Sequence, residues 1–185
     1  MGGIEIVTAG TADAPRIAEI HVAAWRETYA GMMPAATLAG LDLAEWTERW
    51  RGRLAREDAA EATFLALDGS GAAGFGHCRP QTSQKLAPLG YSGEIAALYL
   101  LRRIQRRGVG TRLLRRMATH LLEHGYDSAS VWVFRDAPRA HRFYEAHGAK
   151  ATGIEGVWEI YGMTLPDLAY GWRDLNGLSG QARAG

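Results

Sequence analysis

A nearly continuous apolar run over residues 94–101 is followed, after an arginine-rich turn, by a helical pattern that begins at Gly108. A short apolar run of this kind predicts a strand that is buried on both faces. Apolar residues then recur at helical spacing, namely Val109, Leu113, Leu114, Met117 and Leu121. They predict an amphipathic helix that stops at Gly125. A buried strand that leads directly into such a helix is typical of a protein in which helices cover a sheet.

The rest of the chain repeats this alternation of strand and helix patterns. Strands are expected at 4–8, 63–67, 72–78, 130–134, 150–154 and 169–173. Helices are expected from a cap at Asp13 to near Gly31, and over 43–56 and 138–147, whereas 79–93 is expected to be a loop. No repeat or composition shift divides the chain. The order predicts a mixed α/β sheet flanked by helices, in a single domain over 1–175 with a flexible tail over 176–185.

Composition narrows the classes of partner. Among 185 residues, 21 basic and 20 acidic side chains give a formal net charge of +1, so no whole-molecule field favours nucleic acid or a membrane. The start does not have the pattern of a signal peptide, and the longest uncharged stretch, 28–41, is too short to span a bilayer. Cys78 is the single cysteine, which excludes a disulfide framework. We therefore expect a cytoplasmic protein with no nucleic-acid partner and no membrane partner.

The turn QRRGVGT, residues 105–111, carries the strongest chemical signal. The first turn of a helix has unpaired backbone N–H groups and a positive dipole end, and glycines let a ligand approach closely. A dinucleotide fingerprint needs a third glycine where Leu113 stands, and a P-loop needs a lysine that is missing. The residues alone leave two interpretations open: a phosphate-binding turn, or a tight turn with solvated arginines.

A second segment, RDAPRAHRFYEAHGA (135–149), favours the interpretation as a phosphate-binding turn. Together with LYLLRRIQRRGVGTRLL (98–114), it resembles the GNAT acetyltransferase family. The family's phosphate loop is matched by Gln105, Gly108 and Gly110, and its second signature by Ala140, Phe143, Tyr144, Glu145 and Gly148. HVAAWRETYAGMMP (21–34) and GMTLPDLAYGW (162–172) are also similar to segments of one GNAT subgroup. The resemblance spans most of residues 4–173.

The resemblance implies the GNAT fold, with a central, mostly antiparallel sheet flanked by helices, and acetyl-CoA as the acetyl donor with no metal. The backbone of residues 98–100 would pair with the pantetheine arm, in a gap that a bulge opens beside the strand at 130–134. N–H groups from Arg106 to Thr111 would hold the pyrophosphate, and Arg102 and Arg107 are candidates for the 3′-phosphate. The implied cofactor-binding residues are Leu98, Tyr99, Leu100, Gln105, Arg106, Arg107, Gly108, Val109, Gly110 and Thr111.

The implied reaction is direct attack of a primary amine of a small molecule on the thioester. Glu94 would take the ammonium proton, and Tyr144 would protonate the leaving thiolate. The backbone near Leu100 would stabilise the oxyanion. Trp25 and Tyr29, one helical turn apart, would line the acceptor pocket together with Met32 and Met33. Each aromatic or carboxylate side chain also has a purely structural interpretation, in core packing or at a strand edge.

Two positions depart from the family pattern. Ala137 replaces an asparagine that often holds the cofactor arm, which puts one polar contact in doubt. Ala149 replaces the phenylalanine that commonly follows Gly148, which we expect to change packing only.

Several alternatives stay open at this point. The acceptor could instead be a peptide or protein N-terminus or a lysine, whereas no acidic cluster favours an aminoglycoside. Different classes of function are a non-catalytic acyl-CoA-binding module and a nucleic-acid-binding protein that uses the arginine cluster of 102–116. His120, Glu123 and His124 spell H-x-x-E-H, but their position at a helix end disfavours zinc. Cys78 is expected to be buried, and His77 to project toward the acceptor. A homodimer is a further alternative.

Overall fold

The structure is a computed structural model that describes residues 3–180. Its seven strands are β1 (Glu5–Thr8), β2 (Ala62–Asp68), β3 (Gly71–Pro80), β4 (Gly93–Leu100), β5 (Ala129–Phe134), β6 (Lys150–Ile160) and β7 (Met163–Trp172). They form one sheet in the order β1-β2-β3-β4-β5-β7-β6. Every neighbouring pair is antiparallel except β4 and β5, which run parallel. The predicted mixed, mostly antiparallel sheet is confirmed.

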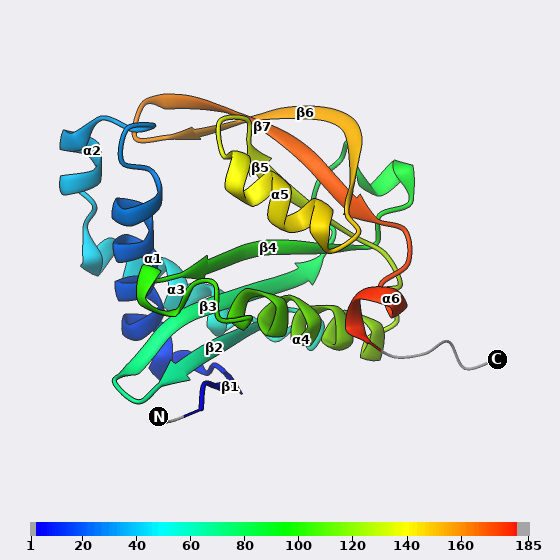
Figure 1. Ribbon diagram of the computed structural model, residues 1–185, viewed down its shortest axis with the longest axis horizontal. Helices are drawn as coiled ribbons and strands as arrows, with labels where there is room; N and C mark the ends of the chain where they lie inside the picture. The colour runs from blue at the N-terminus through cyan, green and yellow to red at the C-terminus, as the bar shows by residue number, and fades with distance from the viewer. Residues whose placement is uncertain (1–2, 181–185) are drawn as a thin grey trace.

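Helices cover both faces of this sheet. They are α1 (Ala14–Thr28), α2 (Ala35–Ala39), α3 (Leu43–Leu54), α4 (Val109–Glu123), α5 (Pro138–Ala146) and α6 (Asn176–Ser179). Short 3₁₀ turns lie at Thr11–Asp13, Ala87–Leu89 and Arg102–Ile104. Figure 1 shows β4 across the middle of the view, with β1, β2 and β3 below it and β5, β6 and β7 above it. None of the helices within residues 3–180 has both the length and the apolar character that crossing a bilayer requires.

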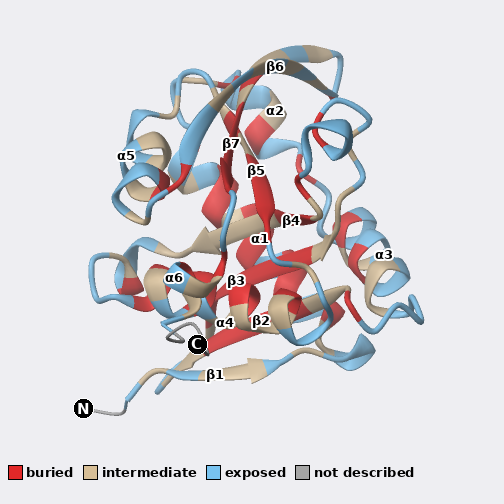
Figure 2. Cartoon of the chain, turned by 90° about the vertical axis from the view of Figure 1, so that its right-hand side faces the viewer, coloured by how far each residue is buried: buried red, intermediate tan, exposed pale blue. Residues whose placement is uncertain are grey.

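Two apolar cores hold the layers together, one on each face of the sheet. On the α4 face, the helical stripe that the sequence predicted packs against β5 and α5, through Leu113, Leu114, Met117, Val131 and Tyr144. On the α1 face, α1 and α3 contribute Ile17, Trp25, Trp46 and Trp50, which pack against Phe75 of β3. Figure 2 shows the buried central strands and the more exposed edge strands β1 and β6.

Glycine in the left-handed conformation ends α4 as predicted. His124 is the C-cap residue, and Gly125 follows with a φ of 84°, a conformation that glycine adopts without a steric cost. At the other end of the chain, Asp13 is the N-cap residue of α1, with Pro15 in the first turn. Its carboxylate accepts a bond from the backbone N–H of Gly10 at 3.0 Å instead of from a helical N–H.

Three expectations need correction. The last two strands are longer than predicted, because the turn Tyr161-Gly162, with φ values of 51° and 72°, joins them as a tight hairpin. The short helix α2 was not predicted. The expected flexible tail from residue 176 begins instead with α6, whose Leu178 is buried in the α4 core. The remainder of that expected tail, 181–185, lies outside the described residues.

Candidate active site

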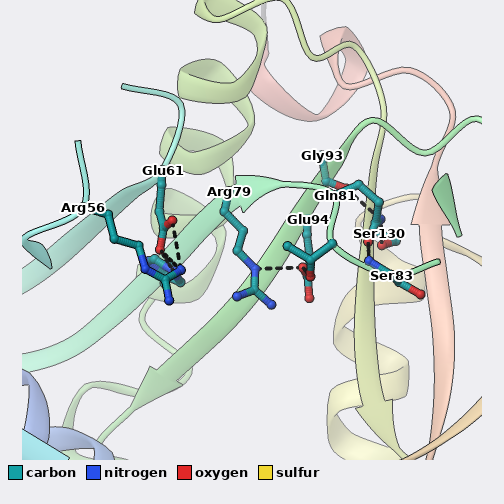
Figure 3. Close-up of polar contacts among 10 residues, drawn as sticks. Arg56, Glu61, Arg79, Gln81, Ser83, Gly93, Glu94 and Ser130 are labelled. Carbon is teal, nitrogen blue, oxygen red and sulfur yellow. Dashed lines mark hydrogen bonds and ion pairs between the residues drawn. The ribbon is translucent and has the colours of Figure 1, made fainter. Parts of the chain in front are cut away.

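The two central strands separate almost as soon as they meet. Within residues 3–180, β4 and β5 pair only at Gly93–Ala129 and Glu94–Ser130. Gln81 fastens this point, because its side-chain amide donates to the Gly93 carbonyl at 3.2 Å and to Ser130 Oγ at 2.6 Å (Figure 3). Beyond Glu94 the two strands diverge, so the rest of β4 has no strand partner on the side that faces β5.

A bulge in β4 accompanies the divergence. The register between β3 and β4 passes from His77–Ala97 to Cys78–Ile95, which leaves one extra residue on β4. Such a bulge bends the strand that contains it. The bulge that the family resemblance implies is therefore present, and it leaves the backbone of residues 98–100 with a free edge toward β5.

A cavity of about 710 Å³ lies where the strands diverge. Since side chains alternate across a strand, its lining belongs to both faces of the sheet. We call the part on the α4 face the α4 half; it is lined by Leu98, Val131, Val133, Ala137, Ala140 and Tyr144. The part on the α1 face, the α1 half, has an aromatic wall made of His21, Trp25, Tyr29, Trp46, Trp50 and Tyr99. The charged residues that line the cavity are Arg53, Arg79, Lys85, Glu94 and Asp167.

The turn between β4 and α4 presents free backbone N–H groups. Gly108 is the N-cap residue of α4, with a φ of 75°, and no side chain caps the helix. The first helical bond runs from Arg112 N to Gly108 O at 3.1 Å, so the N–H groups of 109–111 have no helical acceptor. A Cβ built at Gly108 would meet no atom within 4 Å. Open space beside unpaired N–H groups at a helix N-terminus suits an anionic group.

The second glycine of this turn has a different role from the one expected. Gly110 is buried, and a Cβ built there would lie 3.2 Å from a Phe143 ring carbon and 3.4 Å from Leu100 Cδ1. The residue therefore lets α4 pack against α5 and β4. Its missing side chain does not open the surface to a ligand, which corrects the expected reason for this glycine.

The polar side chains around the turn are used in three ways. Gln105 donates to the Leu100 carbonyl at 2.8 Å, which ties the turn to the end of β4. Arg102 donates to the Glu27 carbonyl at 2.6 Å, so its guanidinium lies against the end of α1. The Thr111 hydroxyl lies 2.9 Å from His147 Nε2. The backbone of the turn is therefore more available to a ligand than these side chains are.

Arg106, Arg107 and Gly108 are the exposed residues of the turn. Arg106 has a φ of 59°, a left-handed conformation that is uncommon for a residue with a side chain. This conformation belongs to the geometry of the turn just before Gly108. Both guanidinium groups add positive charge beside the free N–H groups.

Tyr144 lines the α4 half, and the residue is 7% exposed. It packs edge-on against Trp172, with ring centroids 6.0 Å apart. Burial raises the pKa of the Tyr144 hydroxyl above its usual value of 10.0. The phenol is therefore protonated at neutral pH and is able to donate a proton into the cavity.

Glu94 lines the cavity at the last paired position of β4 and is 6% exposed. Its Oε2 accepts a bond from Arg79 Nε at 2.8 Å (Figure 3) and another from Thr82 Oγ1 at 3.0 Å. Within the described chain, Oε1 accepts no hydrogen bond. The carboxylate is thus fixed by one oxygen and keeps the other for a ligand.

The α1 half receives only part of the expected acceptor lining. Trp25 and Tyr29 both line it, with ring centroids 5.4 Å apart in an edge-on arrangement. Met32 and Met33 do not; they line a separate small cavity of about 30 Å³ next to Tyr29. Met33 is buried in the core on the α1 face, and neither methionine lines the main cavity, which corrects that expectation.

Sequence patterns did not single out four further lining residues. Trp46, Trp50 and Arg53 lie on α3, within the helix expected over 43–56, but the sequence did not indicate what that helix packs against. Asp167 lies on β7, and its Oδ1 is buried without a hydrogen bond. Burial raises the pKa of the Asp167 carboxyl. A carboxylate inside an otherwise apolar strand was the available signal for it.

The structure also shows where Cys78, His77 and the H-x-x-E-H pattern lie. Cys78 is fully buried, as expected, and burial raises the pKa of its thiol to about 12. His77 does line the cavity, with Nδ1 2.9 Å from Thr63 Oγ1. Glu123 of the H-x-x-E-H pattern pairs with Arg116 at 3.6 Å. Among residues 3–180, no three His, Cys, Asp or Glu side chains gather so as to hold a metal ion.

Comparisons with known proteins agree with this geometry. The sequence matches the Acetyltransferase (GNAT) family over residues 14–149. A relative named "Uncharacterized N-acetyltransferase YuaI", from Bacillus subtilis (strain 168), is 36% identical over 167 residues, which cover 90% of this chain and 91% of the relative.

Two solved structures show the same fold. The PaiA N-acetyltransferase from Thermoplasma acidophilum, in complex with coenzyme A, has a TM-score of 0.69 at 19% identity, covering 90% of this chain and 98% of that one. The structure of yncA, a putative acetyltransferase from Salmonella typhimurium with acetyl-CoA, has a TM-score of 0.67 at 16% identity and covers 94% of each chain.

The fold and these matches define a class of protein, the acetyltransferases with a splayed central sheet. The chain belongs to the GNAT family and is an N-acetyltransferase, which confirms the family and the enzyme class that its motifs indicated.

Proposed function

We propose that this enzyme transfers an acetyl group from acetyl-CoA to a primary amine of a small molecule, by direct attack of the amine on the thioester. The observation that carries the proposal is the unpaired edge of β4, which opens onto a cavity of about 710 Å³ reaching both faces of the sheet. A donor could enter from the α4 face and an acceptor from the α1 face. The cytoplasmic location and the single domain predicted from the sequence belong to this proposal.

The residues present fit coenzyme A at two places. The free N–H groups at the start of α4 suit a pyrophosphate, and the open space at Gly108 leaves room for it. The free edge of β4 suits the amides of an extended arm, as in strand addition. When bound, acetyl-CoA supplies an activated acetyl group on a thioester. Ala137 lines the α4 half with a methyl group, so this chain offers no amide side chain there.

In this proposal, Glu94 acts as the general base. An ammonium has no lone pair, so the acceptor must lose a proton before it attacks. Oε1 of Glu94 is free to accept that proton, directly or through a water, while Arg79 and Thr82 hold Oε2. The pair with Arg79 also keeps the carboxylate oriented toward the cavity.

In this proposal, Tyr144 acts as the general acid. It lies in the α4 half, where the thiolate would leave, and its raised pKa keeps it protonated. A backbone N–H near Leu100, on the free edge of β4, would stabilise the developing oxyanion.

A small acceptor is favoured over a protein by the walls of the α1 half. Helices α1 and α3 contribute Trp25 and Trp50, and the β6–β7 hairpin contributes Trp158. Ring centroids of Trp25 and Trp158 lie 5.2 Å apart. Such a wall encloses a compact molecule more readily than a folded chain.

The test is thiol release from acetyl-CoA with purified protein and a panel of primary amines, amino acids and peptides. We expect at least one free small amine to be acetylated, with peptides slower. Faster turnover on peptides would assign the acceptor to a protein chain, and binding of acetyl-CoA with no turnover on any amine would support a non-catalytic module.

A further inference from the structure

Helix α3 carries two arginines one turn apart, and each stacks on a tryptophan. The guanidinium carbon of Arg49 lies 5.0 Å from the ring centroid of Trp46, and that of Arg53 lies 4.9 Å from the ring centroid of Trp50. Arg49 also forms an ion pair with Glu45 and does not line the cavity. Arg53 lines the cavity, and within residues 3–180 it has no ion pair and no side-chain hydrogen bond.

The carboxylates near Arg53 already have other partners. Glu94 is bound to Arg79 at 2.8 Å. Glu61 lies 3.4 Å from Arg56 (Figure 3) and 3.3 Å from His77. The α3 end of the α1 half therefore holds a positive charge without an anion of its own.

The charges elsewhere in the cavity do not change this balance. Asp167 has Lys85 as its charged neighbour, and Lys85 Nζ donates to the Glu155 carbonyl at 2.8 Å. These groups belong to the β6–β7 end of the cavity. The surplus cation at the α3 end is thus Arg53.

Keeping this cation in place is costly for the free protein. Burial lowers the pKa of Arg53, and so do the positive charges of Arg79, Arg56 and Arg49, whereas the negative charge of Glu61 partly offsets them. A guanidinium nevertheless stays charged in proteins. A partly buried charge without a counter-ion costs free energy, which an anionic ligand would recover.

The surroundings of Arg53 indicate the rest of such a ligand. His21 stacks on Trp46, with ring centroids 3.9 Å apart, and burial together with Arg53 lowers its pKa to about 3. The imidazole is therefore neutral, and with Tyr99 it forms an uncharged aromatic wall. A guanidinium binds a carboxylate through two parallel hydrogen bonds. The aromatic wall beside it suits an apolar group. Together they suit a ligand that joins a carboxylate to an apolar body.

We propose that Arg53 binds the carboxylate of the acceptor, so that the substrate is a small amino acid-type molecule with an apolar body. The inference rests on the proposed function. Arg53 and Arg79 are electrostatic neighbours, and Arg79 holds Glu94. Arg53 and Glu94 line the same cavity, so a small molecule whose carboxylate binds Arg53 can present its amine to Glu94.

The experiment compares apolar amino acids with their carboxamides as acceptors, at fixed pH, in the wild type and in Arg53→Gln. In the wild type, we expect kcat/KM for an acid to exceed that for its amide by about tenfold or more, mainly through KM. Arg53→Gln should remove this preference, and Arg53→Lys should keep part of it because the charge remains without the fork. Arg49→Gln is the matched control and should keep the wild-type ratio.

A second readout does not depend on turnover. The N-acetyl amino acid product retains the carboxylate, so calorimetry should show about tenfold weaker binding to Arg53→Gln than to wild type and to Arg49→Gln. Amides that serve as well as acids, or a preference that survives in Arg53→Gln, would overturn the inference and leave the proposed function intact. Absence of acetylation for every amine, with or without a carboxylate, would overturn both.

Discussion

Arg79 Nε lies 2.8 Å from Oε2 of Glu94, across the antiparallel pair of β3 and β4. Glu94 is the last residue of β4 that pairs with β5, so the ion pair holds its carboxylate where the two strands begin to diverge. A carboxylate held by one oxygen is oriented, but its second oxygen can still exchange a proton. This relationship underlies the first prediction.

Glu94→Gln should lower turnover by about 10²–10⁴-fold near neutral pH, because the amide cannot take a proton from the ammonium. The loss should shrink as the pH rises above the pKa of the acceptor amine, since a free amine needs no base. A pH–rate profile checks both points. Glu61→Gln is the control, because Glu61 also contacts an arginine but does not line the cavity. An unchanged profile would reassign the base.

Tyr144→Phe should lower kcat by about 10²–10⁴-fold while the affinity for acetyl-CoA changes little, because the variant keeps the ring and loses only the proton donor. Steady-state kinetics and calorimetry separate the two quantities. Tyr91→Phe serves as control, since Tyr91 is also buried, at 5% exposure, and lies away from the cavity. Equal turnover in the wild type and Tyr144→Phe would remove Tyr144 from the mechanism.

Gly108→Val should weaken acetyl-CoA binding by tenfold or more, roughly 1.4 kcal/mol at least, because its side chain would fill the space beside the free N–H groups. Gly125→Val makes a matched comparison. Both glycines have open space around a Cβ and positive φ, 75° and 84°, at opposite ends of α4. Both variants should therefore lose stability, but Gly125→Val should bind acetyl-CoA like the wild type. Equal affinities in the two variants would refute the anion site.

His21 should make the fold sensitive to acid. Burial lowers its pKa from 6.5 to about 3, so between these values the unfolded chain binds a proton that the folded chain does not. The free energy of unfolding should then fall by about 1.4 kcal/mol for each pH unit below the upper value. His21→Asn, which keeps an acceptor for Trp50 Nε1, should show a shallower fall in urea titrations at several pH values. An equally steep fall in the variant would exclude His21 as the source.

Much of the scaffold could be predicted from the sequence because its signals are local. The stripe of α4, its end at Gly125 and the signature with Phe143 and Tyr144 are patterns within a few turns of one helix. The family resemblance rested on such patterns. The expected order was correct for the seven strands and for α1, α3, α4 and α5 for the same reason, whereas the short helices α2 and α6 were missed.

The composition of the α1 half could not be predicted, because it depends on packing between distant segments. Trp50 donates to His21 Nδ1 at 3.2 Å across 29 residues of sequence. Arg53 and Asp167 enter the same cavity from α3 and β7. Met32 and Met33 were wrongly expected there, because the direction of the loop after α1 is not encoded in their spacing.

A crystal structure of the protein with acetyl-CoA would test most directly whether the donor binds where β4 and β5 diverge. The account predicts density for the diphosphate against the backbone N–H groups of 106–111, with the arm along the free edge of β4 and the thioester near Tyr144. An empty turn at Gly108, with the ligand bound elsewhere or absent at saturating concentration, would contradict it.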